Sequence, residues 1–541
     1  MKKILLPTLM VFLLSGLSFA QNMASVEKSF FSTDQVHSLN LKFNQQDWLY
    51  LLDSLRIQGD GYLLANIEVD GKLYENVGVR YRGSKSFKTG SKRNAFNIKL
   101  NYINKNQNHQ GHKKIKLSNA LRDPSLLREV MGYEIAGNYL PTPKAGYTNL
   151  SINKENYGLF IAIEPVDKVF LTKHYGEAEG SLFKAASDLP DKMSKSCKNK
   201  IYAALEYEKD ISCYMGNFEI NSDAGWDDLI ELTDILNNRP QDIEKVLNVD
   251  RTLWMLAFNN AIANLSSYTG QHSQNFYLYK DQYGRFNPIV WDLNLAFGSY
   301  KNTGMGSDLD LKGLQTMDPL LHLDDDTKPL ISQLLKKEEY KKIYLDHIRT
   351  IIYDHFVNNK YATRAQELQA MIRPSFDKDP NKFYTTAEFV GSLTQTTGKR
   401  SKIPGLVELM SKRARFLKKH PELAIFPPEI NEVKLTQREK FSTREIKDFQ
   451  FVVTVKNRAN RVKLFFRPNP ESPYESVYLA DDGKHNDEAA GDKIFGITVA
   501  PTDGQDTLEY YFQTENAKAS GFYPRNYMYE PGTISLKELN K

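Results

Sequence analysis

An asparagine and an aspartate flank a predicted β-hairpin in the middle of the chain. Asn275 precedes the first strand of the hairpin 277–290, and Asp292 follows the second. Because the outer ends of a hairpin lie side by side, both side chains are expected at the same end. Amide and carboxylate oxygens are hard ligands that suit Mg²⁺ beside a triphosphate. The alternative is a structural role, in which Trp291 and Phe297 are core residues and Asp292 only forms a turn.

A basic segment that contains a glycine lies nearer the N-terminus and suits phosphate binding. Residues 79–86 read Val-Arg-Tyr-Arg-Gly-Ser-Lys-Ser, and they are followed by Lys92 and by an alternating strand, 96–100, that carries Lys99. A turn of small residues lets backbone N–H groups approach a phosphate, and a basic side chain on the next strand neutralises it. A basic hairpin can also be no more than a solvated face, which is the alternative.

A predicted helix after this segment carries two glutamates. Asp123 is a suitable N-cap and Pro124 suits the first helical position, and Glu129 and Glu134 follow. Phosphoryl-transfer sites of the kinase type use a helix carboxylate to pair with the phosphate-binding lysine, and Glu129 is the better placed. An ordinary amphipathic helix would carry the same glutamates.

These candidate residues are spread over a β-rich first part and a helical second part of the chain. Alternating apolar residues predict strands at 36–46, 65–69, 77–82, 96–100, 147–152 and 159–163, the last two joined by a turn at 156–158. Helical periodicity then dominates, at 226–238, 250–265, 330–356, 364–373 and 405–420. A β-rich lobe with one inserted helix, followed by a larger helical lobe, is the ground plan of protein kinases.

The pair Pro427-Pro428 marks the start of a different, all-β part. Short alternating segments at 449–455, 462–467 and 508–513 predict a sandwich of about 100 residues, the size of an immunoglobulin-like module. One of its loops is rich in aspartate, with Asp481, Asp482, Asp487 and Asp492 spaced around glycines. Such a loop can hold a structural Ca²⁺. A turn stabilised by aspartate side chains is the alternative.

The N-terminus has the pattern of a secretory signal. Met1-Lys2-Lys3 precedes an apolar run, 4–17, and Ser18-Phe19-Ala20 offers a small-residue cleavage site. The run is shorter than the roughly 20 residues of a membrane span, although an uncleaved anchor is the alternative. We therefore expect cleavage near Ala20 and a mature protein that is periplasmic, released or at the cell surface. No later stretch of the sequence is apolar enough to cross a bilayer.

Composition and motif searches exclude several classes of function. The net charge is +5, with acidic and basic residues interspersed, so we expect no nucleic-acid partner. The sequence contains neither H-E-x-x-H, nor G-x-S-x-G, nor G-x-x-x-x-G-K-[ST]. The two cysteines, Cys197 and Cys213, lie in one lysine-rich segment. In an oxidising compartment they can form a disulfide, and two unpaired thiols are the alternative.

Several short motifs occur in a defined order along the chain. An arginine-glycine-serine loop covers 80–84, and a K-K-x-[FY]-x-I-K type strand covers 92–100. A D-x-S-x-x-R start of a helix is formed by Asp123, Ser125 and Arg128, and Gly158-Leu159-Phe160 is followed by Glu164. The last motif comprises 264–268, 275–279 and 291–298. With these motifs, about residues 36–420 of the chain resemble the CotH kinase family of secreted atypical kinases.

The resemblance implies a kinase-like fold that holds ATP between two lobes and passes phosphate to a serine of a secreted or surface protein. The residues that would bind ATP are Arg82, Gly83, Ser84, Lys92, Lys99 and Glu164. The catalytic group would comprise Ser266, Glu129 and Arg128, and the Mg²⁺ ligands would be Asn275 and Asp292.

One residue departs from the family pattern. Many relatives have N-x-D-S-Y where this chain has Asn264-Leu265-Ser266-Ser267-Tyr268, so Ser266 stands at the position of the catalytic base. A serine hydroxyl does not accept a proton as a carboxylate does, and general-base help is worth ~10²–10⁴ in rate. The resemblance therefore leaves two functions open, a kinase of weakened activity and a pseudokinase that serves as a surface, adhesion or scaffold protein.

We thus predict an α+β protein with a two-lobed kinase-like domain followed by an all-β immunoglobulin-like sandwich. The predicted boundaries are 1–20 for the signal peptide, 21–424 for the kinase-like domain and 425–541 for the β module. Within the second of these, the β-rich lobe covers about 36–165 and the helical lobe about 166–424.

Overall fold

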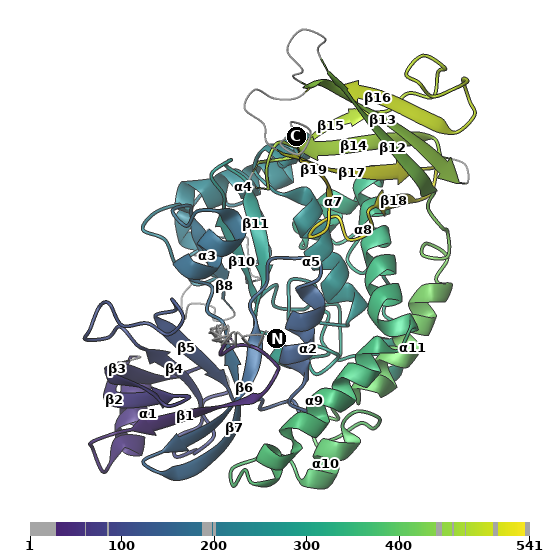
Figure 1. Cartoon of the computed structure of the whole chain (residues 1–541). Coiled ribbons are helices and arrows are strands. Elements are labelled where there is room, and N and C mark those ends of the chain that lie inside the picture. Colours follow the sequence, from purple (N-terminus) through teal and green to yellow (C-terminus); the bar gives the residue numbers. More distant parts are fainter. Residues whose placement is uncertain are drawn as a thin grey trace, which may run out of the picture.

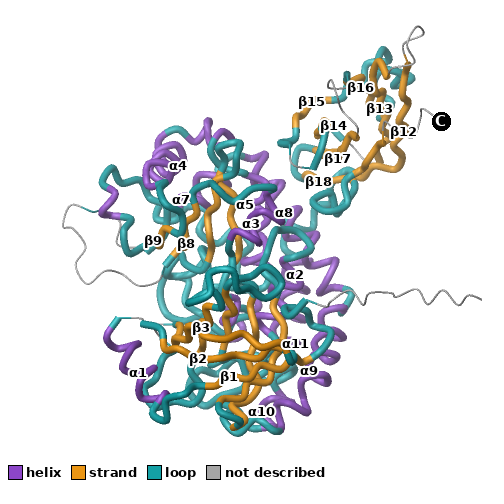
Figure 2. Tube along the Cα trace, turned by 60° about the vertical axis from the view of Figure 1, so that its left-hand side comes forward, coloured by secondary structure: helices purple, strands orange, loops and turns teal. Residues whose placement is uncertain are grey.

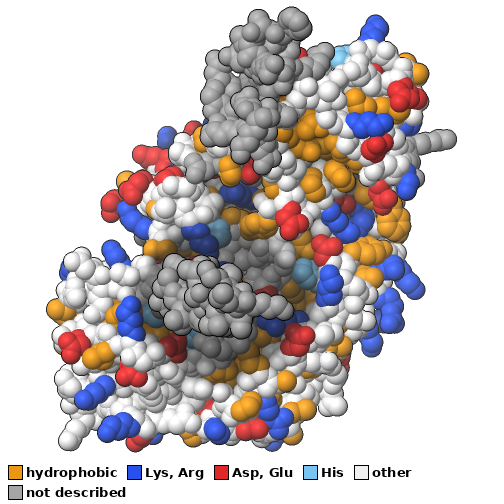
Figure 3. All heavy atoms as spheres, viewed as in Figure 1, with side chains coloured by type: hydrophobic (Ala, Val, Ile, Leu, Met, Phe, Trp, Pro, Cys, Tyr) orange, Lys and Arg blue, Asp and Glu red, His pale blue; other side chains and the backbone are white. Residues whose placement is uncertain are grey.

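A computed structural model gives the fold of the chain (Figure 1). It describes residues 29–535 except for 60, 84–85, 187–196, 198–201, 440–445, 457–458, 471 and 501–506. The predicted signal peptide, 1–20, and Ser84 therefore lie outside the described residues. Acidic and basic side chains are interspersed over the face seen in Figure 3, in agreement with the small net charge. Among the helices that the structure describes, none is both long and apolar enough to span a membrane.

The first strands of the chain form one closed barrel. The strands are β1 (Val36–Lys42), β2 (Leu63–Val69), β3 (Lys72–Arg82), β4 (Ala95–Lys99), β5 (Lys114–Ser118), β6 (Ala145–Ile152) and β7 (Glu155–Ile163). Their order is β1-β2-β3-β4-β5-β7-β6, and a parallel pairing of β1 with β6 closes the barrel. The sequence predicted six of these strands but missed β5. It did not predict the closure either, because pairing between strands about a hundred residues apart leaves no local pattern. Helix α1 (Trp48–Gln58) packs on β2 and β3.

Alternation along β3, β4 and β5 separates an apolar face from a basic one. Their buried residues, among them Val79, Ile98 and Ile115, fill the barrel core. The intervening residues point the other way, since successive side chains of a strand alternate between its faces. In the strand register Arg80 lies opposite Asn97, and Asn97 lies opposite Lys116. The outer face of these strands therefore presents a basic surface, and this surface forms one wall of the site described below.

Helix α2 (Arg128–Ala136) follows the barrel strand β5 and begins later than predicted. The backbone of Leu126 is left-handed, with φ 57°, which stops a helix from starting at Pro124. Asp123 still stabilises the helix start, because its carboxylate accepts hydrogen bonds from the backbone N–H groups of Ser125 and Arg128 at 3.0 and 2.8 Å. The turn between β6 and β7 lies at Asn153-Lys154, with φ of 50° and 72°, and precedes the predicted turn.

The middle of the chain is helical and surrounds a second, four-stranded sheet. Its helices are α3 (Lys168–Tyr175), α4 (Trp226–Asn238), α5 (Val249–Ala261), α6 (Leu311–Gln315), α7 (Pro329–Leu335), α8 (Glu338–Ile351), α9 (Lys360–Asp377), α10 (Thr386–Gly391) and α11 (Leu406–Lys419), with short helical turns at Ile211–Cys213, Pro240–Lys245, Leu293–Leu295 and Ile352–Val357. The sheet has the order β11-β10-β8-β9, with β8 (Leu182–Ala185), β9 (Phe218–Ile220), β10 (Phe276–Lys280) and β11 (Phe286–Val290). The predicted hairpin is the antiparallel pair β10–β11. Cys197 and Cys213 form a disulfide, with an S–S distance of 2.06 Å.

The C-terminal part is a β module of two sheets around one apolar core. One sheet comprises β12 (Glu429–Glu439), β13 (Ile446–Lys456) and β16 (Ile494–Val499). The other comprises β14 (Arg461–Arg467), β15 (Glu475–Tyr478), β17 (Thr507–Glu515), β18 (Ser520–Tyr523) and β19 (Gly532–Ser535). Phe451 of the first sheet and Leu464 and Phe512 of the second are fully buried in the shared core.

The β module is packed against the helical region, at the end away from the barrel (Figures 1 and 2). The Trp254 side chain on α5 donates a hydrogen bond to the hydroxyl of Tyr527 at 3.1 Å, and that hydroxyl donates to Asp250 at 2.8 Å. Lys342 on α8 forms an ion pair of 2.6 Å with Glu515 on β17. These contacts involve buried groups, so the module is fixed to the helical region rather than tethered to it.

Candidate active site

A cleft of about 820 Å³ separates the barrel from the helical region. One wall is the basic outer face of β3–β5, which contributes Arg82 and Lys116. The other wall contributes Ser266, Asn275 and Asp292, from the loop after α5 and the two ends of the β10–β11 hairpin. Figure 2 shows the barrel strands and the strands of the second sheet as separate groups, one below the other. The predicted basic segment and the predicted pair of oxygen ligands therefore face one another across one cavity.

Asn275 and Asp292 lie side by side because one more backbone hydrogen bond extends the hairpin beyond the ends of its strands. The backbone N–H of Trp291 donates to the carbonyl of Asn275 at 3.1 Å. Asn275 and Asp292 both have left-handed backbones, with φ of 62° and 52°, which turn the chain out of the hairpin at this point. The Tyr133 hydroxyl of α2 accepts the backbone N–H of Asp292 at 3.0 Å. Trp291 and Phe297 are buried core residues, as the structural alternative for this motif predicts.

The side chains of this pair offer oxygens to a ligand. The Asn275 amide nitrogen donates to the backbone carbonyl and the hydroxyl of Ser266, at 2.9 and 3.1 Å. Since the nitrogen is engaged, the amide oxygen is the atom left for a ligand. Asp292 has a carboxylate oxygen, Oδ1, that is buried and has no hydrogen-bond partner among the described residues. Two such oxygens at one place form a donor set that suits Mg²⁺.

Positive charge dominates the walls of the cleft. Seven cationic residues line it, against the two carboxylates Glu219 and Asp292: Arg56, Arg80, Arg82, Lys114, Lys116, Arg122 and Lys184. The Lys116 ammonium lies 4.3 Å from the centre of the Trp291 ring. Burial lowers the pKa of Lys116 well below its ordinary value, and the charges of Arg82, Lys184 and Lys114 lower it further. A bound polyanion would offset the repulsion among these cationic side chains, so the cleft suits a ligand with several negative charges.

Glu129, on the first turn of α2, is fully buried and is affected by the charge of Asp292. Neither of its oxygens makes a hydrogen bond of ordinary geometry among the described residues. Burial and the charge of Asp292 raise its pKa to about 8, although Arg82 and the Ser118 side chain favour the ionised form. The charge of Asp292 thus opposes ionisation of Glu129, and the charge of Arg82 favours it. A metal ion at Asp292 would relieve this repulsion.

Two lysines that the sequence suggested as phosphate ligands do not line the cleft. Lys92 is about half exposed and forms an ion pair with Glu155 at 3.4 Å, outside the cleft. Lys99 belongs to the basic face of β4 but lies beyond the lining residues, opposite Lys114 on β5. The lysine that lies over Trp291, next to Asp292, is Lys116. Of the other predicted ATP-binding residues, Arg82 and Gly83 line the cleft.

Arg128 and Glu164 also lie away from the cleft, each with partners of its own. The Arg128 guanidinium is fully buried, pairs with Asp123 at 2.7 Å and donates to the carbonyl of Pro404, so it ties α2 to the segment before α11. Glu164 follows β7, where it accepts the backbone N–H of Lys144 at 2.9 Å and contacts His112 at 3.4 Å. Arg128 thus connects α2 with the helical region, whereas these partners of Glu164 lie in loops of the barrel.

Several lining residues were not identified from the sequence. Lys114 and Lys116 alternate with apolar residues on β5, as Asn97 and Lys99 do on β4, so the alternation was visible. The sequence did not show that β5 pairs with β4, which brings Lys116 to the same face as Arg82. His272 lines the cleft from the loop that also carries Ser266 and Asn275.

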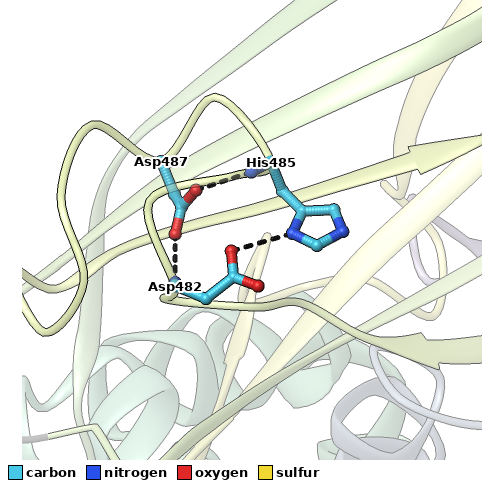
Figure 4. A group of neighbouring side chains, drawn as sticks. All are labelled: Asp482, His485 and Asp487. Atoms are coloured by element: carbon cyan, nitrogen blue, oxygen red, sulfur yellow. Dashed lines mark hydrogen bonds and ion pairs between the residues drawn. The ribbon is translucent and has the colours of Figure 1, made fainter.

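The aspartate-rich loop of the β module has the contacts of a stabilised turn (Figure 4). The buried Asp487 carboxylate accepts the backbone N–H groups of Asp482, Gly483 and His485. Asp482 contacts His485 Nδ1 at 2.9 Å. Asp481, Asp482 and Asp492 also accept backbone N–H groups, from Gly491, Lys484 and Ala489. Asp482, His485 and Asp487 each offer a ligand atom within 4.8 Å of the others, so these three residues could hold a metal ion. The hydrogen bonds of the carboxylates to backbone N–H groups nevertheless favour the turn alternative.

Comparison with known proteins identifies the family. The model of the family described as CotH kinase protein matches residues 79–417, from within β3 to near the end of α11, and so includes every described residue that lines the cleft except Arg56. The inner spore coat protein H of Bacillus subtilis (strain 168) is 24% identical over 320 residues, which cover 57% of this chain and 79% of that protein. The family match covers more than half of the 541 residues, with the β module outside it. The chain therefore belongs to the CotH kinase protein family.

Proposed function

We propose that this chain is a secreted atypical protein kinase, which binds Mg²⁺ and ATP in the cleft and phosphorylates a serine hydroxyl of an extracytoplasmic protein. The observation that carries the proposal is the placement of Arg82 and Lys116 opposite Asn275 and Asp292 across one cavity. Family membership supports an atypical kinase. The barrel with α2 would act as the smaller lobe and the helical region as the larger one. Secretion is inferred from residues 1–20 of the sequence alone.

The residues that line the cleft fit a nucleotide with its metal ion. Arg82 Nη1 and Asp292 Oδ1 are both buried without a hydrogen-bond partner among the described residues. A ligand could therefore accept a hydrogen bond from the first atom and bind through a metal ion to the second. Arg82 and Lys116 would contact the phosphates, and Asn275 and Asp292 would hold Mg²⁺. The bound metal would neutralise charge that develops on the phosphates. The basic face of β3–β5 would lower the same charge from the opposite side.

Ser266 is poorly suited to take the proton of the acceptor hydroxyl. It is fully buried, and its hydroxyl oxygen accepts from Asn275 at 3.1 Å and faces the Gln274 amide nitrogen at 3.4 Å. An alcohol oxygen that already receives such bonds is a very weak base. The side chain is therefore a structural link in the loop that carries Asn275.

His272 is the better candidate for the proton acceptor. The carboxylates that line the cleft are Asp292, which is assigned to the metal, and Glu219, which pairs with Lys184 at 3.0 Å. His272 lies on the same loop as Ser266, and its ring is held between those of Tyr202 and Tyr300, at centroid distances of 4.3 and 5.8 Å. As the hydroxyl oxygen bonds to the γ-phosphorus, its proton would pass to the imidazole. The bond from that phosphorus to the β–γ bridging oxygen breaks, and ADP keeps the electron pair.

Binding and transfer assays on the full chain test this function separately. Calorimetry with ATP and Mg²⁺ should show binding that Asp292→Asn weakens at least tenfold, because one charged metal ligand is lost. Transfer of labelled γ-phosphate to casein, used as a generic serine acceptor, should be lost in His272→Gln while nucleotide binding remains. Absence of nucleotide binding would overturn the proposal. Binding without transfer would instead favour the pseudokinase, since Ser266 stands where relatives carry a carboxylate.

A further inference from the structure

A second cavity, of about 620 Å³, lies where the β module meets the helical region. Its walls come from α3, the start of α5 and the β10–β11 turn on one side, and from β14, β17 and the loop after β18 on the other. In Figure 3 the surface is hollowed below the β module. Among the described residues this cavity shares no lining residue with the nucleotide cleft. It is therefore a separate site.

Four buried polar atoms on its walls have no hydrogen-bond partner among the described residues. They are His174 Nε2, Tyr175 OH, Arg285 Nε and Tyr474 OH. Tyr175 is only 8% exposed, so its hydroxyl is well removed from bulk water. Buried polar groups are normally paired, and four unpaired ones on a single cavity point to a polar ligand. They come from both the helical region and the β module, so a ligand that pairs with them would bridge the two.

The chemistry of these four atoms suits hydroxyl groups. A phenol both donates and accepts, and a guanidinium N–H only donates. Burial and the neighbouring Lys173 lower the pKa of His174 to about 4, so its ring is neutral at physiological pH. A neutral imidazole nitrogen donates or accepts according to its tautomer. A ligand rich in hydroxyl groups can match every member of this set.

Aromatic rings provide flat apolar surfaces beside the polar atoms. Tyr283 and Tyr529 are 42% and 44% exposed at the cavity, and Phe465 and Tyr511 lie stacked with their ring centroids 4.6 Å apart. The C–H faces of a pyranose ring pack against such surfaces. Among the described residues, the four carboxylates of the cavity already have partners. Asp250 accepts from Tyr527, and Asp281 accepts from Asn287 at 2.9 Å. Glu244 accepts from the Tyr340 hydroxyl, and Glu339 forms an ion pair with Lys337 at 3.8 Å. A cation is therefore not the ligand that these walls favour.

We propose that the junction cavity binds an oligosaccharide. The proposal rests on hydroxyl-matching atoms and exposed tyrosine rings in one cavity between two fixed parts of the chain. Because the module is held by buried contacts such as Trp254–Tyr527, the cavity is formed before the ligand arrives, which reduces the entropic cost of binding. Such a site would attach the protein to a glycan, and it does not depend on phosphoryl transfer.

Calorimetry on the full chain with defined sugars tests this proposal. The probes are cellohexaose and chitohexaose, which are neutral, and trigalacturonic acid, which is acidic. Binding of at least one at micromolar to millimolar concentration is expected. The double variant Tyr283→Ala/Tyr529→Ala should weaken it about tenfold or more, since both ring surfaces are lost. Tyr478→Ala is the matched control, because Tyr478 is 45% exposed on the same module but does not line the cavity.

A second variant separates the polar from the aromatic contribution. Tyr474→Phe removes one unpartnered hydroxyl and keeps the ring, so it should weaken binding several-fold without unfolding the module. If no probe binds, or if the double variant and Tyr478→Ala bind equally well, the proposal is wrong. Binding of a polyproline peptide in place of every sugar would also overturn it, since tyrosine-lined grooves accept such peptides. Nucleotide binding should be the same in all of these variants, so failure here leaves the proposed function untouched.

Discussion

The amide nitrogen of Asn275 donates to both the backbone carbonyl and the hydroxyl of Ser266, at 2.9 and 3.1 Å. The two bonds fix the rotation of the amide, so the amide oxygen, and not the nitrogen, is left for a metal ion. A carboxylate at position 266 could accept from the same nitrogen. We therefore expect the identity of residue 266 to affect proton transfer more than the geometry of the proposed metal site.

Introduction of an aspartate at position 266 should bypass His272. In a His272→Gln background, Ser266→Asp is expected to raise γ-phosphate transfer by about 10²-fold, because a carboxylate then accepts the hydroxyl proton. Initial rates of transfer to casein measure this gain. Ser266→Asn is the matched control, since it has similar size and hydrogen bonding but no basic oxygen. Equal rates for the Asp and Asn variants would contradict a proton acceptor at this position.

The local parts of the site could be predicted from the sequence, whereas the parts set by tertiary pairing could not. Asn275 and Asp292 were placed together correctly because a hairpin is a local structure whose two ends must meet. Lys116 was missed because β5 itself was not predicted, and because its position depends on the pairing of β5 with β4 and on closure of the barrel. Lys92 was suggested instead because it follows the glycine-containing loop closely in sequence, but its side chain turns to Glu155 at the surface.

The motif around α2 also depends on tertiary contacts that could not be predicted from the sequence. Asp123, Ser125 and Arg128 were expected to start a helix, and Arg128 also to contribute to catalysis. They do form one cluster, since the Arg128 guanidinium pairs with Asp123 at 2.7 Å. The left-handed Leu126 delays the helix, and the cluster points into the protein interior, where the sequence gives no indication of the Pro404 carbonyl that completes it.

Loss of the Lys116 charge should weaken nucleotide binding more than loss of the Lys92 charge. Lys116→Met is expected to raise the dissociation constant of ATP with Mg²⁺ about tenfold, because one charge-assisted contact to phosphate is lost. Lys92→Met removes the same charge from an exposed position outside the cleft and should leave binding unchanged. Calorimetry on both variants measures the difference. A larger effect from Lys92 would mean that the phosphates do not lie against the outer face of β5.

Reduction of the disulfide between Cys197 and Cys213 should destabilise the chain. The bond closes a loop with a sequence separation of 16 residues, and loops of this length stabilise by roughly 3 kcal/mol in the chain-entropy view. Urea unfolding with and without reductant measures the change. Because the chain has two cysteines, reductant acts on this bond alone, and the Cys197→Ser/Cys213→Ser variant should match the reduced protein. Superimposable unfolding curves would contradict this expectation.

Calcium should not stabilise the β module. Since Asp487 is fully buried and accepts three backbone N–H groups, its carboxylate already has partners. The melting temperature of the full chain is therefore expected to be the same with Ca²⁺ and with EDTA. Asp487→Ala should destabilise by about 1–3 kcal/mol, because buried N–H groups lose their acceptor. A calcium-dependent rise in melting temperature that Asp487→Ala abolishes would restore the metal interpretation.

His112 joins the barrel to the segment before α3, and its charge should make stability depend on pH. Burial disfavours the imidazolium, but hydrogen bonds to Asp167 and Glu164, together with their charges, more than offset burial and raise the His112 pKa to about 9. A folded-state pKa above the ordinary value of about 6.5 means that the contribution is complete below about pH 6.5. It is then lost as the pH rises toward 9.

The free energy of unfolding is therefore expected to fall between pH 6.5 and 9 by on the order of 2 kcal/mol more in the native chain than in His112→Gln. Burial opposes the ionised form of Glu164 as well, but bonds from His112 and the Lys144 N–H lower its pKa, so its own contribution is lost only in acid. Urea titrations at several pH values on both proteins measure the difference. Subtraction of the two pH profiles removes the contributions of the titrating groups that both proteins share. Parallel pH profiles for the two proteins would show that the contacts of His112 with Asp167 and Glu164 do not stabilise its charged form.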